Sequence, residues 1–167
     1  CVQEINATGV NLAAFEYLDE NMLNDCKKYD KKVDIVLNKQ VILFKFCGPS
    51  KEHIQADIEL IQKIVSKHSN YPFKWSKDEE SRHRLWKVRK MAFWAAKFAN
   101  PGKECLITDV AVPFSKFNDS LVLCKLEMDK SWLNCPIVGH IGDGNWHSVI
   151  FYDKNKPKDI AESHRLN

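Results

Sequence analysis

The stretch IVGHIGDGNWHSVIFYD, residues 137–153, decides how this part of the chain folds, because apolar runs flank the dipeptide Asp143-Gly144. Asp-Gly is a strong signal for a two-residue type I′ turn, since both turn positions need positive φ and these residues supply it at low cost. We therefore expect a β-hairpin here. A turn centred on the dipeptide pairs His140 with His147 across the two strands, with both side chains on the same face.

The two histidines are candidate ligands of one divalent metal ion. Directly opposed residues on neighbouring strands have Cβ atoms about 4.5–5.5 Å apart, so the imidazoles of His140 and His147 can reach a single zinc or manganese ion. Such an ion needs at least a third protein ligand, commonly a carboxylate, and an open position for substrate or water. The alternative interpretation of the pattern is a surface hairpin with two solvated histidines. A phosphate-binding loop is not expected, because these glycines lead into a strand and not into a helix.

The composition is typical of one domain. A chain of 167 residues with 44% hydrophobic content can bury one core, so residues 1–167 are predicted to form a single domain. The formal charge of +3 is spread over both signs, which disfavours a nucleic-acid partner. No run approaches the roughly 18 apolar residues of a membrane span, so no transmembrane segment is expected. The six cysteines are scattered without a C-x-x-C pair and are predicted to be reduced core residues.

The spacing of apolar residues predicts strands divided by helices. Ser50 and Asp78 are expected to cap two of the helices. The expected helices cover residues 20–29, 50–68, 79–99 and 115–130, and the expected strands cover 13–19, 40–48, 104–113 and the hairpin 136–152, with a short extended piece at 72–78. This order predicts an α+β fold, in which helices pack mainly on one face of a mostly antiparallel sheet.

The ends of the chain suggest a piece of a longer protein. The first residue is Cys1 and not methionine. The last stretch, KPKDIAESHRLN (156–167), stops within the first turns of what reads as a helix, without a stop signal. We therefore expect the natural protein to extend further.

The helix expected at 79–99 carries a second candidate site. Arg82, Trp86, Arg89 and Phe93 follow one another at helical spacing and share one face. An arginine beside aromatic residues can hold a planar anion, because its guanidinium matches a carboxylate with two parallel hydrogen bonds. The alternative is a solvated arginine pair beside an aromatic packing face.

Three stretches together resemble the C-terminal substrate domain of FAD-linked oxidases, most closely that of the mitochondrial, cytochrome-linked D-lactate dehydrogenases. They are HRLWKVRKMAFWAA (83–96), TDVAVPFSKF (108–117) and the hairpin stretch, in this order and spacing. The G-H-x-G-D-G-N-x-H signature is specific when the D-V-x-V-P strand and the L-W-x-x-R helix accompany it. AAFEYLDENMLNDCKKY (13–29) is similar to the start of the same domain, so the resemblance spans nearly the whole chain.

The resemblance implies a flavoenzyme that oxidises a D-2-hydroxy acid, such as D-lactate to pyruvate. Hydride would pass to FAD, and electrons would then pass to an acceptor such as cytochrome c. Carried over by position, His140 and His147 would be ligands in the family's two-histidine, one-glutamate metal site, which would hold zinc or manganese. Arg89 would bind the substrate carboxylate, and Asn145 would lie near the flavin and the substrate. A mitochondrial location is implied by the same resemblance.

The resemblance also implies parts that these residues lack. In the family, an FAD-binding domain precedes this region, and the third metal ligand and probable base come from a downstream Glu-His-Gly segment. The chain is therefore expected to contain no catalytic base and to be inactive by itself. Ile107 and Thr108 stand where related 2-hydroxyglutarate dehydrogenases carry a lysine, which favours a monocarboxylate such as lactate. Two hypotheses stay open: a substrate-and-metal domain of a flavoenzyme, and a non-catalytic metal-binding or interaction domain that retains the fold.

Overall fold

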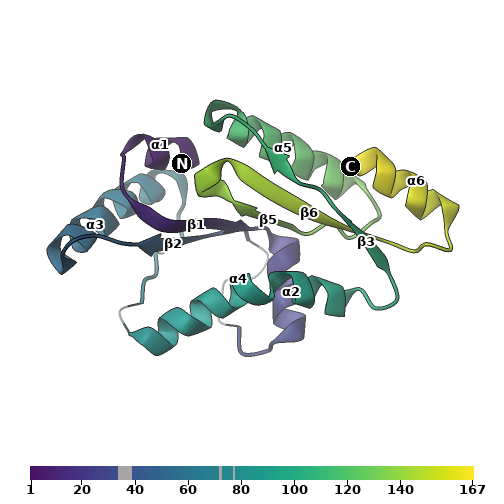
Figure 1. The fold of residues 1–167 in the computed structure, drawn as a ribbon, viewed down its shortest axis with the longest axis horizontal. Helices are drawn as coiled ribbons and strands as arrows, with labels where there is room; N and C mark the ends of the chain where they lie inside the picture. Colours follow the sequence, from purple (N-terminus) through teal and green to yellow (C-terminus); the bar gives the residue numbers. More distant parts are fainter. Residues whose placement is uncertain (34–38, 72, 77) are drawn as a thin grey trace.

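The computed structural model describes residues 1–33, 39–71, 73–76 and 78–167. Helices and strands follow one another in mixed order (Figure 1). The helices are α1 (Val2–Ala7), α2 (Glu20–Tyr29), α3 (Lys51–His68), α4 (Glu79–Ala99), α5 (Phe114–Lys130) and α6 (Pro157–Leu166), with a 3₁₀ helix η1 (Ile141–Asp143). The strands are β1 (Leu12–Leu18), β2 (Val41–Phe46), β3 (Glu104–Ile107), β4 (Val110–Ala111), β5 (Ile137–His140) and β6 (Asn145–Tyr152). No helix within the described ranges is long and apolar enough to cross a membrane.

The strands form one antiparallel sheet. Its order is β2-β1-β5-β6-β3, and β4 also pairs with β6. The predicted α+β class with an antiparallel sheet is therefore confirmed. This order places β1 beside β5, and β5 beside β6, so a strand near the N-terminus lies next to the β5–β6 hairpin at the middle of the sheet (Figure 1).

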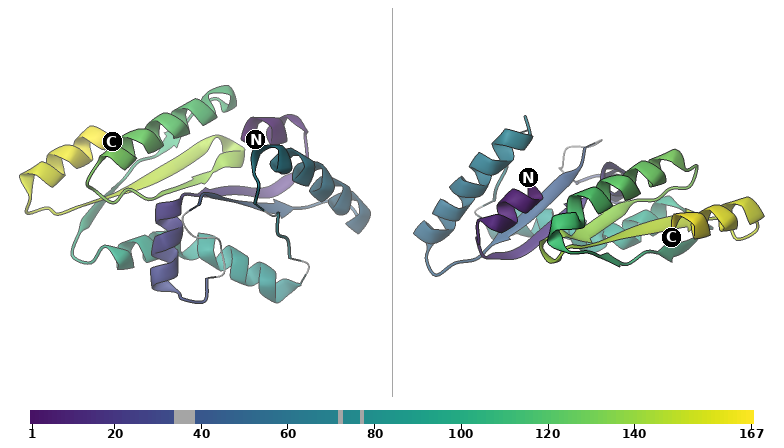
Figure 2. Two further views of the ribbon diagram at one scale, coloured as in Figure 1. Left: turned by 180° about the vertical axis from the view of Figure 1, so that it is seen from behind. Right: turned by 90° about the horizontal axis from the view of Figure 1, so that it is seen from above.

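Helices cover both faces of this sheet, because its strands carry apolar side chains on both sides. On one face, α2 and α4 pack against strand residues that include Leu18 and Val138. On the other face, α1, α3 and α5 pack against residues that include Tyr17 and Ile137, and α6 adjoins α5 (Figure 2). Most helices thus share one face as expected. The helices expected at 20–29 and 79–99 are the exceptions, since α2 and α4 lie together on the opposite face.

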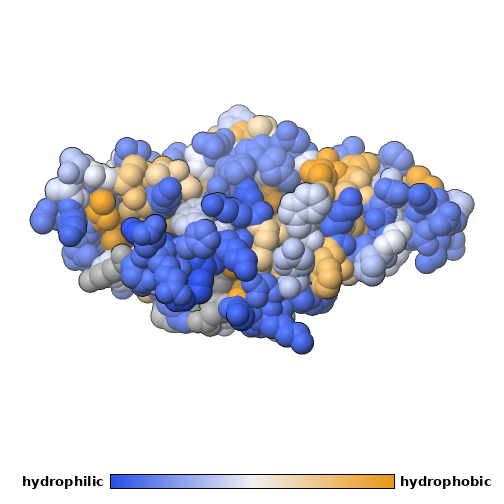
Figure 3. All heavy atoms as spheres, turned by 60° about the horizontal axis from the view of Figure 1, so that its bottom comes forward, coloured by the Kyte–Doolittle hydropathy of each residue, from blue (hydrophilic) through white to orange (hydrophobic). Residues whose placement is uncertain are grey.

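The surface around α2 and α4 is mainly hydrophilic, with separate apolar patches (Figure 3). The largest exposed apolar side chains of α4 are Trp94 and Phe98, which are 62% and 61% exposed. Phe98 packs edge to face against Tyr29 of α2, with ring centroids 5.4 Å apart. These aromatic residues lie toward the C-terminal end of α4.

Local sequence signals explain most of the element boundaries. Ser50 and Asp78 cap α3 and α4, since their side chains accept hydrogen bonds from the backbone N–H groups of His53 and Ser81 at 3.2 Å and 2.8 Å. The sequence analysis did not anticipate α1. In the extended piece expected at 72–78, positions 72 and 77 lie outside the described residues, and 73–76 form no regular element.

The strand expected at 104–113 is divided into β3 and β4, both paired with β6. The division falls at Thr108, which is buried and exchanges hydrogen bonds with Ser148. Its backbone N–H donates to the Ser148 carbonyl at 3.0 Å, and its hydroxyl accepts from the Ser148 N–H at 2.9 Å. The Thr108 hydroxyl thus replaces a backbone carbonyl as the acceptor for the Ser148 N–H, and β4 starts two residues later, at Val110. All six cysteines are free, and Cys26 and Cys135 are buried.

The hairpin has a longer turn than predicted. His140 pairs with Asn145 and not with His147, because Ile141 to Asp143 form η1 and Gly144 adopts a φ of +71°. Ile141, which begins η1, is fully buried in the core. The register moves by two residues, which preserves the side chain faces. The prediction that both histidines point to one side is confirmed, and the prediction that they are directly opposed is wrong.

Asp19 joins β1, α2 and β5 from a fully buried position. Its Oδ1 accepts from the Met22 N–H at 2.8 Å, which caps α2, and from the Ile137 N–H at 3.0 Å, at the start of β5. Lys125 Nζ of α5 lies 3.6 Å from Oδ2. Burial raises the pKa of the Asp19 carboxyl to about 6, although the two backbone hydrogen bonds and Lys125 act in the opposite direction.

Because Asp19 is buried, the free energy of unfolding is expected to depend on pH. The pKa of Asp19 in the folded state lies above its ordinary value, so its stabilising contribution is complete below about pH 4 and is lost as pH rises to about 6. Asp19→Asn keeps the acceptor oxygen without the charge. Urea unfolding should show that the wild type becomes less stable relative to Asp19→Asn across this interval, by about 1–3 kcal/mol. A constant difference between the two proteins would contradict the assignment.

Candidate functional site

The predicted site residues lie on the α4 side of the sheet. Asn145 and His147 are two residues apart on β6, so their side chains lie on the same face of the sheet. His140 of β5 pairs with Asn145, so its side chain lies on that face as well. Arg89 reaches the same place from α4. The neighbours of Arg89 on its helix face take other roles: Trp86 and Phe93 pack against the core, and Arg82 is exposed. The fold thus brings together all four residues that the sequence singled out.

A buried carboxylate connects two of these residues. Glu16 of β1 accepts a hydrogen bond from Arg89 Nε through Oε2 at 2.8 Å, and its Oε1 lies 2.9 Å from His140 Nδ1. Arg89 also approaches the other ring nitrogen, with its terminal nitrogen Nη2 at 3.1 Å from His140 Nε2. The Glu16 side chain is 10% exposed and that of Arg89 is 19% exposed. Glu16, Arg89 and His140 therefore form a closed triangle of polar contacts.

A second polar group lies around His147. Its Nδ1 is 3.3 Å from Asp109 Oδ1, and the Asn145 amide donates to the same oxygen at 2.9 Å. Asn145 also donates to the carbonyl of Val110 at 3.2 Å. The imidazoles of His140 and His147 lie edge to face with centroids 5.9 Å apart, and thus connect this group to the triangle. Glu16, His140, His147 and Asn145 thus form a continuous row of polar side chains across β1, β5 and β6.

The donor set fits two ligands of a metal ion but not a complete site. His140 and His147 are close together, and imidazole nitrogen suits zinc and other divalent transition metals. Among the residues that the structure describes, however, no group of three or more His, Cys, Asp or Glu side chains is arranged to hold a metal ion. A metal centre here would need a further ligand.

A hollow of about 360 Å³ lies beside the triangle. It runs between the first half of β1 and η1, and Glu16 and His140 contribute to its lining. Here β1 pairs with β5 only at Tyr17 and Leu18, so among the described residues no strand pairs with the first half of β1 on that side. A small ligand bound at the triangle would therefore have space next to it.

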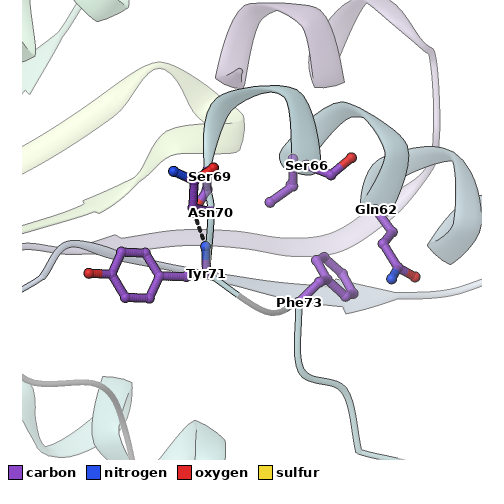
Figure 4. A pocket seen from close by; sticks show the side chains of 7 residues that line it. Gln62, Ser66, Ser69, Asn70, Tyr71 and Phe73 are labelled. Carbon is purple, nitrogen blue, oxygen red and sulfur yellow. Dashed lines mark hydrogen bonds between the residues drawn. The ribbon is translucent and has the colours of Figure 1, made fainter.

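A second hollow, of about 320 Å³, lies elsewhere, at the C-terminal end of α3 (Figure 4). Gln62 and Ser66 line it from the helix, and the aromatic ring of Phe73 lies across from them. The Ser69 hydroxyl accepts from the backbone N–H of Tyr71 at 3.1 Å and holds the chain in a turn there. None of the residues lining this hollow belongs to the row of polar side chains, so it is separate from the candidate site.

Glu16 is the residue of the candidate site that the sequence patterns did not indicate. The stretch AAFEYLD was interpreted as a strand, and Glu16 is the only charged residue within its strand, β1. A charged residue in an apolar strand is a signal for a buried partner, because an unpaired buried charge is costly. The pattern could not identify Arg89 as that partner, since the two residues are 73 positions apart and meet only in the folded chain.

Comparison with known proteins identifies the family of the chain. The model of the family described as FAD linked oxidases, C-terminal domain, matches residues 1–167. Among curated proteins, the chain is 37% identical over 163 residues to the mitochondrial D-lactate dehydrogenase (cytochrome) of Kluyveromyces lactis, covering 95% of this chain and 28% of the relative. It is 32% identical over 160 residues to the Arabidopsis thaliana protein of the same name, covering 96% and 28%.

More distant proteins extend the relationship. The glycolate oxidase subunit GlcD of Escherichia coli K12 is 26% identical over 165 residues, covering 99% of this chain and 32% of that protein. The solved structure of 4-ethylphenol oxidase from Gulosibacter chungangensis, in complex with isoeugenol, superposes with a TM-score of 0.59 at 12% identity, covering 92% of this chain and 36% of that one. That likeness concerns the fold. The chain spans about a third or less of each of these proteins, and it belongs to the FAD linked oxidases, as a C-terminal domain of that family.

Proposed function

We propose that this chain is the substrate-binding domain of a flavin-dependent D-2-hydroxy acid dehydrogenase that oxidises D-lactate to pyruvate. The observation that carries the proposal is the triangle of Glu16, Arg89 and His140, with His147 beside it. A 2-hydroxy acid presents a carboxylate next to a hydroxyl, and the cluster offers a guanidinium next to two imidazoles. The relatives that are 32–37% identical are named D-lactate dehydrogenases, which supports the same substrate.

Arg89 would bind the substrate carboxylate. Glu16 occupies its Nε at 2.8 Å and His140 Nε2 lies 3.1 Å from Nη2, so one N–H of Nη1 and the second N–H of Nη2 are left to form parallel hydrogen bonds to both carboxylate oxygens. A carboxylate held at two points has one orientation. The hydrogen on C2 would then keep a fixed direction relative to the hydride acceptor, which lowers the entropic part of the barrier.

His140 and His147 would hold a divalent ion, zinc or manganese, with a further ligand from outside the described residues. Such an ion, when bound, supplies a positive charge that lowers the pKa of the substrate hydroxyl. FAD, bound mainly by another part of the full-length enzyme, supplies the acceptor for the C2 hydride. Asn145, which Asp109 and the Val110 carbonyl hold in place, would contact the flavin or the substrate at this face. An acceptor such as cytochrome c and a mitochondrial location belong to the same proposal and follow from the relatives' names.

The structure around β3 supports a monocarboxylate substrate. Thr108 is buried, with only 6% of its surface exposed, so its side chain is poorly accessible to a second carboxylate. Ile107 pairs with Val149 and is 50% exposed, and its apolar side chain offers no charge partner either. A dicarboxylate would therefore leave its second charge without a partner at these two positions.

Substrate preference in the full-length protein tests the proposal. With a dye as electron acceptor, steady-state kinetics should give a far larger kcat/KM for D-lactate than for L-lactate or D-2-hydroxyglutarate. The L-isomer can place either its carboxylate or its C2 hydrogen correctly, but not both. FAD-loaded protein that oxidises no D-2-hydroxy acid would contradict the proposal and would favour the non-catalytic metal-binding or interaction domain.

A further inference from the structure

We propose that Glu16 is a positioning residue that fixes the orientation of the Arg89 guanidinium and the tautomer of His140 at the same time. The consequence for turnover rests on the proposed function. The expected effect on the His140 ring is independent of the proposed function, because it follows from the contacts of these three side chains. Glu16 does not touch the substrate in this proposal and acts through its two neighbours.

The two carboxylate oxygens of Glu16 have separate tasks. Oε2 accepts from Arg89 Nε at 2.8 Å, and Oε1 faces His140 Nδ1 at 2.9 Å. An ionised carboxylate can only accept hydrogen bonds, so the proton of a neutral His140 ring must sit on Nδ1. Nε2 then carries a lone pair, and Arg89 Nη2, a donor, lies 3.1 Å from it. The three distances are consistent with this one arrangement of protons.

Glu16 can orient its neighbours because its own backbone and side chain are held in place. It lies within β1, where it pairs with Leu43 of β2, so the sheet holds its backbone. Its side chain is 10% exposed, while the His140 side chain that it contacts is 46% exposed. The buried carboxylate can therefore orient a ring that would otherwise be free to rotate at the surface.

This arrangement prepares both neighbours for a 2-hydroxy acid. Because Glu16 takes Nε of Arg89 and His140 takes one N–H of Nη2, a carboxylate can bind at the remaining N–H groups of Nη1 and Nη2. Because the ring proton is on Nδ1, Nε2 of His140 keeps a lone pair, which faces Arg89 Nη2 in this structure and could instead bind a metal ion or accept a hydroxyl proton. Glu16 thus sets both the orientation of the Arg89 guanidinium and the position of the His140 ring proton.

The competing explanation is an ion pair that merely holds α4 against β1. Glu16→Gln separates the two. The glutamine oxygen can still accept from Arg89 Nε, but its amide would donate to His140 Nδ1 and move the ring proton to Nε2, which also breaks the contact between Nε2 and Arg89 Nη2. Glu16→Ala removes both contacts. Glu80→Gln is the matched control, since Glu80 forms an exposed ion pair with Arg84 at 2.6 Å on the same helix as Arg89.

The test uses the full-length, FAD-loaded protein and begins with kinetics on D-lactate. Glu16→Gln should lower kcat about 10- to 100-fold, normalised to bound flavin, with little change in KM. Glu16→Ala should also raise KM, because Arg89 is no longer held. Glu80→Gln should behave as the wild type. The dissociation constant of 2-hydroxy-2-methylpropanoate, which has no C2 hydrogen and cannot be oxidised, should follow KM and rise only in Glu16→Ala.

A readout independent of turnover is nitrogen NMR of metal-free, [¹⁵N]histidine-labelled protein, with the His140 signals assigned from a His140→Gln variant. His140 should be protonated at Nδ1 in the wild type and in Glu80→Gln, and at Nε2 in Glu16→Gln. A wild-type ring protonated at Nε2, or a ring unchanged in Glu16→Gln, would overturn the proposal. If the wild type shows the expected tautomers but oxidises no 2-hydroxy acid, the positioning role stands and the proposed function fails.

Discussion

Replacing Arg89 by alanine in the full-length enzyme is expected to lower kcat/KM for D-lactate roughly 30- to 900-fold, equivalent to about 2–4 kcal/mol of transition-state binding. Arg89 is held by Glu16 at 2.8 Å, and its terminal nitrogens face the same side of the sheet as the two histidines. Without the guanidinium, the carboxylate loses its charge-assisted contact and C2 loses its fixed direction. Bound metal should remain at the wild-type level, because the histidines are unchanged.

Lysine at this position should not restore activity. Arg89→Lys keeps the positive charge but cannot bind Glu16 and both carboxylate oxygens at once, since an ammonium group is a point charge. Arg84→Ala is the control, because Arg84 is on the same helix and its ion pair with Glu80 is exposed. Near wild-type kcat/KM in Arg89→Ala would show that Arg89 belongs only to the packing of α4, and the carboxylate anchor would then lie elsewhere.

His147→Ala is expected to lower bound metal and activity together, each by at least about 100-fold relative to the wild type. His147 lies in the middle of β6 at 26% side-chain exposure, and its ring contacts that of His140 with centroids 5.9 Å apart. Loss of one of two imidazoles leaves too few ligands from this chain to hold a divalent ion. The protein should still fold, because His147 is not part of the buried core.

Metal analysis of the purified protein, run beside kinetics on D-lactate, separates this defect from that of Arg89→Ala. His164→Ala is the matched control, since His164 is exposed on α6, away from the row of polar side chains. His147→Ala with a full complement of metal would remove His147 from the ligand set. Full activity after loss of the metal would mean that the ion has no part in turnover.

The hairpin illustrates what the sequence could and could not predict. The Asp143-Gly144 signal located the turn, but the turn is longer than two residues, because Ile141 to Asp143 form η1 with Ile141 buried in the core. Local turn chemistry carries no information about which residue the core will bury. The shift of register was two residues, so His140 and His147 stayed on one face, and the inference about their side chains survived the wrong pairing.

Tertiary contacts explain the remaining differences. The apolar stripes of the helices were legible, but a stripe does not say which face of the sheet it will cover, and α4 packs on the face opposite α3 and α5. Glu16 lies in a strand that was predicted, yet its partners come from α4 and β5. Helical spacing identified Arg89 without identifying the carboxylate that holds it. The cluster of Glu16, Arg89 and His140 forms only after the strands have paired and α4 has packed against the sheet.

The most direct test of the proposed function is anaerobic mixing of the oxidised full-length enzyme with D-lactate while the flavin absorbance is recorded. The wild type should bleach, because hydride transfer needs no further electron acceptor. Arg89→Ala should bleach only at much higher D-lactate concentrations, since the substrate carboxylate has lost its anchor. A wild-type flavin that D-lactate leaves oxidised, or bleaching with the same D-lactate dependence in both proteins, would contradict this account of the site.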